Sequence, residues 1–390
     1  MFIKNLHKLA GSSLAPVACG GKTIDVREHL ISRIRRTARQ SVQLFQARKK
    51  GIDISNKWFK SPPWILLLVS LLTACGDSHI VWPDVNLPEF PLPSSMPPLD
   101  VVSVGPISEL PNAVVNGVTY NTTATNVTIN GTTGALTDLQ IGHIVTVSGT
   151  LSKGWETGIA ASVEFEANVV GPIESIDTSR RQIVVMGQPI LFDTDTAFDS
   201  GIDPLSLTGL NVGTVVQISG FPAGSGEIVA TRVEPALSNS DFQVIGTVTG
   251  LDLGNLSFQI NGLEVDYSSA FIIDLPDGMP AEAMNVVVRG SLSTDGQFIA
   301  AQIMDVAQDG NIAAGTQMEI TGYILNYHSD TDFEVSGFPV TTDYQTIFYF
   351  GKREDLWPGA KVEINGQRTV SGAIVADQIG FDGLAITLNL

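Results

Sequence analysis

Residues 213–220 read Gly-Thr-Val-Val-Gln-Ile-Ser-Gly, a short apolar stretch with a glycine at each end. The same pattern, G-x-x-V-x-V/I-x-G, returns at 142–149 and 359–366. Residues 283–290 match it too, except that alanine replaces the first glycine. One pattern at four places, about 70 residues apart, indicates a tandem repeat. The fold is built from this repeat.

Three other patterns accompany this block in the same order in every copy. A G-x-[V/I] element comes first, an apolar-x-V/I-x-G element follows, and an A-x-x-V/I element comes last. The first lies at 105–107, 171–173, 246–248 and 322–324, the second at 113–117, 183–187, 258–262 and 333–337, and the last at 160–163, 230–233, 300–303 and 376–379. Their alternation of apolar and polar residues is typical of half-buried strands. Asn-Gly or Asp-Gly at 116–117, 261–262 and 295–296 is typical of tight turns.

These patterns predict an all-β protein of four tandem, small, antiparallel five-stranded β-barrels of the oligonucleotide/oligosaccharide-binding (OB-like) type. The insertion between the third and fourth strands has room for one short helical turn. We expect alternate Val and Ile of the glycine-bounded block, such as Val216 and Ile218, to point into a core that each copy has for itself. The repeated glycines should lie at strand ends or turns, where a Cβ would clash or φ is positive. The predicted copies are residues 103–170, 171–236, 237–310 and 311–390.

The combined pattern resembles the bacterial family called domain of unknown function 5666. The resemblance covers residues 103–385, and the first copy departs from it in the Asn/Thr-rich stretch 118–134. Members of that family are often lipoproteins or secreted proteins with tandem copies, so the resemblance implies an exported protein. It implies no activity, ligand or catalytic residue.

Charge divides the chain near residue 60. Residues 1–60 hold 13 of the 22 Lys and Arg and 3 of the 40 Asp and Glu, a balance of +10, so the rest carries −28. A body this acidic repels phosphate backbones, which predicts that nucleic acid is not a partner.

An apolar run, 64–74, lies between basic residues and Cys75. It is too short to span a bilayer and has the layout of a signal peptide, which we place at residues 57–75. Leu72-Thr73-Ala74-Cys75 resembles the lipobox of bacterial lipoproteins, so Cys75 is the expected lipidation (palmitate) site and bilayer anchor. A buried apolar helix is the alternative. Gly76 rather than Asp follows the cysteine, which in that resemblance favours the outer over the inner membrane.

Two segments flank the signal. Residues 1–56 form a basic N-terminal extension, either a cytoplasmic or membrane-surface arm or the product of a start codon placed too far upstream. Residues 76–102 contain six prolines and predict an extended linker of roughly 3 Å per residue.

Few residues in the expected mature chain carry chemistry. Its histidines, His79, His143 and His328, have no metal-ligand spacing, and Cys19 precedes the anchor. Asp193-Thr-Asp195 could hold a cation but also fits a solvated surface. No nucleophile elbow or P-loop occurs, so we expect no enzyme, no metal and no cofactor.

Aromatic residues gather in the fourth copy. Exposed rings of small barrels can stack on ligands, and the candidates for this role are Tyr323, Tyr327, Tyr344, Tyr349 and Trp357. Packing in the barrel core or between copies is the alternative, favoured by the strand-like run 347–350. The sequence thus predicts a non-enzymatic, lipid-anchored envelope protein, periplasmic or surface-facing, with a structural or interaction role. The alternative is a glycan- or cation-binding lipoprotein, and the partner would be an envelope protein or a glycan.

Overall fold

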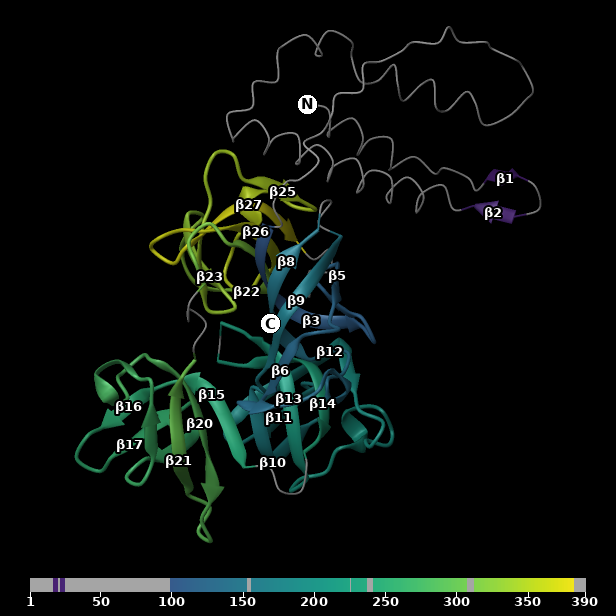
Figure 1. The fold of residues 1–390 in the computed structure, drawn as a ribbon. Helices are drawn as coiled ribbons and strands as arrows, with labels where there is room; N and C mark the ends of the chain where they lie inside the picture. The colour runs from purple at the N-terminus through teal and green to yellow at the C-terminus, as the bar shows by residue number, and fades with distance from the viewer. Residues whose placement is uncertain are drawn as a thin grey trace, which may run out of the picture. The chain divides into compact units, whose positions relative to one another are not determined.

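The computed structural model describes residues 17–19, 22–24, 99–152, 156–224, 226–236, 241–306 and 312–381. Two units are distinguished, residues 1–90 and residues 91–390. In the first unit, β1 (Val17–Cys19) pairs antiparallel with β2 (Lys22–Ile24). The second unit contains all four copies, coloured from blue through green to yellow in Figure 1.

The strands of the four copies follow one order, and a 3-10 turn precedes the fourth strand in each. The first copy contains β3 (Leu99–Glu109), β4 (Ala113–Val115), β5 (Val118–Asn121), β6 (Asn126–Ile129), β7 (Thr132–Thr133), η1 (Leu136–Asp138), β8 (Ile144–Leu151) and β9 (Thr157–Phe165). The second contains β10 (Val169–Asp177), β11 (Gln182–Val185), β12 (Gln188–Phe198), η2 (Leu207–Gly209), β13 (Val215–Pro222) and β14 (Ile228–Pro235).

The later copies repeat this plan. The third contains β15 (Phe242–Thr247), β16 (Thr249–Asp252), β17 (Ser257–Ile260), β18 (Leu263–Asp266), β19 (Phe271–Ile273), η3 (Pro276–Gly278), β20 (Asn285–Leu292) and β21 (Phe298–Asp305). The fourth contains β22 (Gln317–Ser329), β23 (Asp332–Val335), β24 (Phe338–Thr341), β25 (Ile347–Tyr349), η4 (Arg353–Asp355), β26 (Lys361–Arg368) and β27 (Ile374–Phe381). β3 begins at Leu99, so the linker predicted over 76–102 overlaps the first four residues of this strand.

Each copy is a five-stranded barrel, as predicted. In the second copy the ring runs β10–β11–β12–β14–β13 and back to β10, and the fourth copy has the matching ring. In the third copy β15 and β16 together form the first strand. The third and fifth strands pair in parallel, whereas the other pairs are antiparallel. A ring with an odd number of strands cannot alternate direction throughout, so one parallel pair is required.

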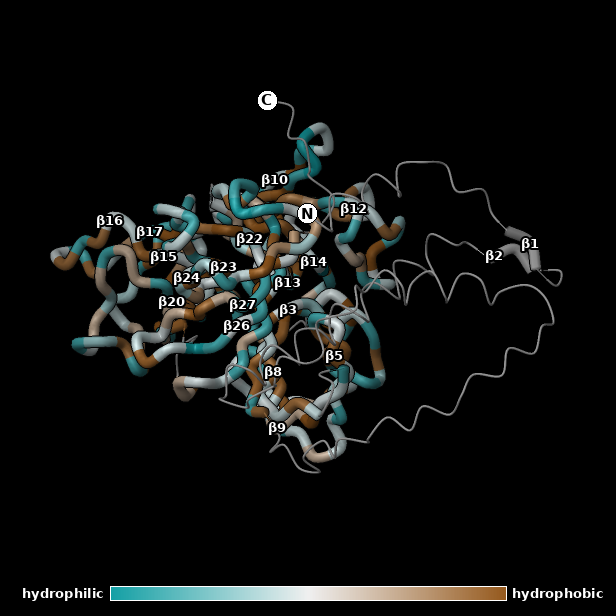
Figure 2. Tube along the Cα trace, turned by 90° about the horizontal axis from the view of Figure 1, so that it is seen from above, coloured by the Kyte–Doolittle hydropathy of each residue, from teal (hydrophilic) through white to brown (hydrophobic). Residues whose placement is uncertain are grey.

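The glycine-bounded block forms the fourth strand and its inward face, as predicted. Its alternate Val and Ile side chains are at most 1% exposed in every copy. They are Val145, Val147, Val216, Ile218, Val286, Val288, Val362 and Ile364. Figure 2 shows the same alternation as brown and teal segments interleaved along the strands.

The last glycine of the block has one role in all four copies, but not at a strand end. Gly149, Gly220, Gly290 and Gly366 each lie inside the fourth strand where the register with the fifth strand shifts. A Cβ there would overlap a carbonyl oxygen of the fifth strand. The glycine therefore permits a β-bulge that bends the strand into the barrel.

The first position of the block needs a positive φ, as predicted. Gly142, Gly213 and Gly359 have φ values of 93°, 85° and 84°, and Ala283 is held at 65°. An L-residue with a Cβ is strained in this region. The third copy therefore has the same positive-φ turn as the other copies, with alanine in place of glycine.

A threonine links the third-strand segment to the fifth strand. The hydroxyls of Thr125, Thr196 and Thr346 donate to the carbonyl oxygens of the alanines that begin the A-x-x-V/I element, at 2.7–2.9 Å. The third copy has Ala270 at the corresponding place. It thus departs from the other copies at two shared positions.

Strand pairing joins copies that are neighbours in the chain and also copies that are not. β22 of the fourth copy pairs in parallel with β3 of the first, and β10 of the second pairs with β15 of the third. The four barrels therefore form two continuous sheets, one from copies one and four and one from copies two and three.

Paired strands also join the cores of copies two and three, which corrects the expectation of one core per copy for these two, while copies one and four keep separate clusters. The cores of copies two and three form a single cluster of buried side chains. On β3, Val101 and Ile107 belong to the first copy's core, while Val102 and Val104 belong to the fourth's. Successive strand residues point to opposite faces, so one strand serves two barrels.

Ala283→Gly should raise the free energy of unfolding by about 1 kcal/mol, because glycine adopts this φ without strain. Urea unfolding measures the change. Ala281→Gly, two residues earlier and without a positive φ, is the control and should stabilise nothing. Equal effects of the two substitutions would contradict the assignment.

Candidate functional site

The structure separates the five aromatic residues predicted as a ligand site. Tyr323 is buried, 9% exposed, and its ring packs edge-on against Phe221 of the second copy at 6.1 Å between centroids. Tyr327 packs on Phe333 at the fourth core. These two rings therefore serve packing, the alternative interpretation of the aromatic cluster.

The other three aromatic residues lie on the connection between β24 and β26. Tyr344 is 91% and Trp357 55% exposed, while Tyr349 is half-buried and burial raises the pKa of its hydroxyl. Arg353 holds this connection in place. Its guanidinium donates to the Thr342 hydroxyl and to the Asp343 carbonyl and lies 5.1 Å from the Phe348 ring centroid.

The other predicted sites are the lipidation site and the candidate cation site. Cys75 lies outside the described residues. Asp193, the candidate cation ligand, accepts the backbone N–H of Asp195 at 2.9 Å and so closes its own turn. Among the described residues no group of three or more His, Cys, Asp or Glu side chains could hold a metal ion.

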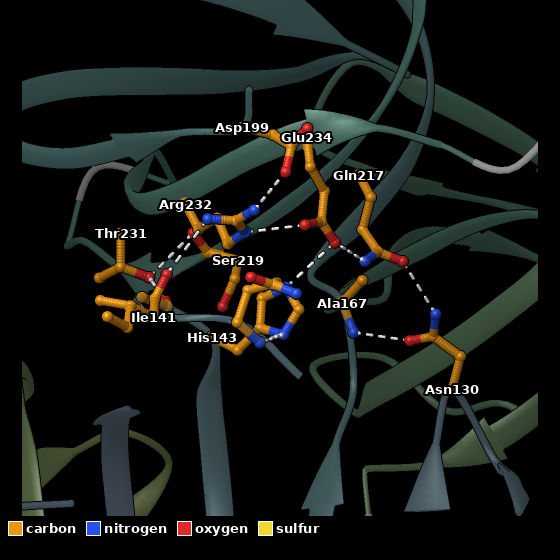
Figure 3. A network of polar contacts seen from close by, with 12 residues as sticks. Asn130, Ile141, His143, Ala167, Asp199, Gln217, Ser219, Thr231, Arg232 and Glu234 are labelled. Carbon is orange, nitrogen blue, oxygen red and sulfur yellow. Dashed lines mark hydrogen bonds and ion pairs between the residues drawn. The ribbon is translucent and has the colours of Figure 1, made fainter. Parts of the chain in front are cut away.

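An extended network of polar groups lies between the first and second copies (Figure 3). We call it the interface network, and it comprises Asn130, His143, Asp199, Gln217, Ser219, Thr231, Arg232 and Glu234. His143 is 2% exposed and stacks on Phe165 with centroids 4.0 Å apart. Its Nδ1 lies 3.2 Å from the backbone nitrogen of Gln140, and its Nε2 lies 3.0 Å from Glu234 Oε1.

Glu234 is the centre of this network. Its second oxygen accepts from Arg232 Nε at 2.7 Å, and Arg232 also donates to Asp199 at 2.6 Å. Burial by itself would raise the pKa of Glu234. The hydrogen bond and the charge interaction with His143, followed by those with Arg232, outweigh that effect and lower the pKa to about 2.

The Asn/Thr-rich stretch of the first copy has a structural role that its sequence did not reveal. It forms the β6–β7 hairpin, whose Asn130 donates to Gln217 of the second copy and accepts the N–H of Ala167. The departure from the family pattern at 118–134 therefore supplies an inter-copy contact.

Two further polar contacts join other copies. Arg289 of the third copy donates to both oxygens of Glu166, at 2.6 and 2.8 Å. Between copies one and four, Tyr120 bonds to Ser103, which donates to Glu319 at 3.0 Å. Burial raises the pKa of Tyr120 strongly, and the nearby Glu319 adds to the effect, while the Ser103 bond opposes it.

These contacts stabilise an assembly of barrels. Their charged groups are paired, which burial requires. Sequence analysis missed the network because its members come from different copies and, as single residues, resemble solvated surface groups. One signal was present: His143 follows a repeated glycine yet recurs in no other copy.

The family comparison agrees with this architecture. A family model described as "Domain of unknown function (DUF5666)" matches residues 104–164, 170–234 and 309–380, together just over half of the chain. The chain belongs to this family. The matched regions fall in copies one, two and four. The third copy, which lies between them, has the same strand order but lacks the shared Thr and first Gly. No curated protein matches the chain.

Glu234→Gln should remove an acid-sensitive part of stability. A depressed carboxyl pKa adds stability above the unfolded value, near 4.5, and this stability is lost as pH falls toward about 2. We expect the wild type to lose on the order of 2 kcal/mol from this group across that window. Unfolding free energies measured from pH 5 to 2 should show a shallower slope in the variant. Exposed Glu264→Gln is the control, and parallel wild-type and E234Q curves would refute the assignment.

Proposed function

We propose that this chain is a lipid-anchored bacterial envelope protein that presents its four barrels as one block, with an interaction role and no enzymatic one. The acylated Cys75 holds it in a bilayer, the outer membrane rather than the inner. Residues from 76 to the start of β3 form the tether. The acidic body disfavours nucleic acid as a partner.

The anchor rests on the sequence. A basic flank, an 11-residue apolar run and Leu72-Thr73-Ala74-Cys75 occur in the order that lipoprotein processing requires. The −28 balance of residues 61–390 favours solubility of the body.

No helix within the described residues has the length and apolar character needed to cross a membrane.

The interaction role rests chiefly on the pairing of β3 with β22. This pairing joins the ends of the repeat array, so the barrels are presented together and not as beads on a string. The Arg289–Glu166 ion pair between copies three and one and the His143–Glu234 hydrogen bond between copies one and two support the same interpretation. Repeats held in this way offer a fixed surface to a partner.

Glycan binding at the fourth barrel is a second candidate function. The high exposure of Tyr344 and Trp357, on a connection fixed by Arg353, favours it, because exposed rigid rings stack on sugar faces. The cation alternative has no comparable support.

Cys75 should carry a diacylglyceryl modification, and the mature chain should begin there. Mass spectrometry of the native N-terminus tests both points. Cys75→Ala should abolish labelling by fatty acid and leave the signal segment attached. An unmodified native peptide running through residues 70–80 would exclude the anchor.

If the fourth barrel binds glycans, Trp357→Ala should weaken binding of neutral glucose hexasaccharides about tenfold, because one stacking contact is lost. Titration calorimetry measures the affinity. Phe271→Ala, which removes a ring on the third barrel that is even more exposed (76% against 55%), is the control and should bind as the wild type does. No measurable binding by the wild type would exclude this candidate.

A further inference from the structure

The short strand β19 in the third barrel has one free side. β19 (Phe271–Ile273) pairs in parallel with β21, and within the described residues no second strand pairs with it. An unpaired strand edge carries backbone donors and acceptors that can receive another strand.

The first barrel shows that this edge can accept a strand. Its β6 occupies the same position, parallel to the fifth strand β9. On its other side β6 pairs antiparallel with β7, a strand supplied by the same chain. In the third barrel the chain turns away after β19, at Asp274 with φ 55°, so the corresponding edge stays open.

Large apolar side chains are exposed on β19 and on the connection that follows it. Phe271 is 76% exposed, and Met279, on the connection after β19, is 52% exposed. Large exposed apolar side chains beside an open edge are a liability unless a partner covers them.

Charge around this edge selects the partner. The third copy, 242–305, has eight acidic residues and one basic residue, Arg289, which is paired with Glu166. Asp274 and Asp277 follow β19 directly and are exposed. The fourth copy, 312–381, whose β25 has a similar edge, has nine acidic and four basic residues, a balance of −5 against −7 for the third copy, so its field is less negative.

We propose that the β19 edge is a strand-acceptor site for an extended, lysine- or arginine-containing segment of another polypeptide. The segment adds antiparallel to β19, as β7 adds to β6, and an apolar side chain of the segment packs on Phe271. Its basic side chains pair with Asp274 and Asp277. Main-chain bonds supply affinity, and charge supplies selectivity. The proposal rests on the interaction role above but not on the anchor.

The test uses residues 76–390 and a seven-residue peptide of alternating lysine and valine. We expect binding that weakens with salt, and protection of the 271–273 amides from hydrogen exchange. The same peptide with alternate backbone nitrogens methylated keeps its charge but loses strand hydrogen bonds, and should bind at least about tenfold more weakly. The glutamate–valine counterpart should not bind.

Two substitutions locate the site. Phe271→Lys should weaken binding of the lysine–valine peptide about tenfold or more, whereas Ile347→Lys, at the matching position of β25, should not. Equal loss in both variants, equal binding of the methylated peptide, or no binding at all would overturn the proposal. Because the soluble chain is used, none of these results bears on acylation of Cys75.

Discussion

Each barrel depends on the contact between a glycine of its fourth strand and a carbonyl oxygen of its fifth. No side chain fits there, because even a Cβ would overlap that oxygen. The bulge at this point bends the strand and lets five short strands close around a core of Val and Ile. The positive φ at the start of the same block sets the direction in which the strand enters. Because both positions are set by the geometry of one strand, the first and last glycines of the block have a fixed spacing. This spacing is what identifies the repeat in the sequence.

A 70-residue barrel buries little apolar surface by itself, and here the copies supply each other with more. β3 is buried on both faces, and its Val101 and Val102 pack into different cores. Largely buried ionic pairs such as Arg289–Glu166 join one barrel to another. Such pairs add modest net stability, but an incorrect arrangement would leave their charges unpaired. They therefore favour one arrangement of the barrels over others.

The sequence predicted the barrels well because their determinants are local. Strand alternation, Asn-Gly turns and the glycine block lie within a few residues of one another. It could not predict how barrels meet, since Val102 and Met318, which pair across β3 and β22, are far apart in the chain. For the candidate site, the sequence indicated that aromatic residues gather in the fourth copy but not which of them are exposed. Tyr323 and Tyr344 look alike in sequence, yet Tyr323 is 9% and Tyr344 is 91% exposed. Exposure depended on the second copy, which covers Tyr323.

The position of β3 also decides how the block would bear mechanical load. The chain enters β3 at Leu99, and the strand is held on one side by β8 over Leu99–Pro106 and on the other by β22 over Val101–Val104. A pull along the axis of β3 loads both ladders in shear, so many hydrogen bonds share the force instead of breaking one after another. A tether attached at Leu99 would thus pull on the strand that joins two barrels, and tension would be distributed into both sides of the block.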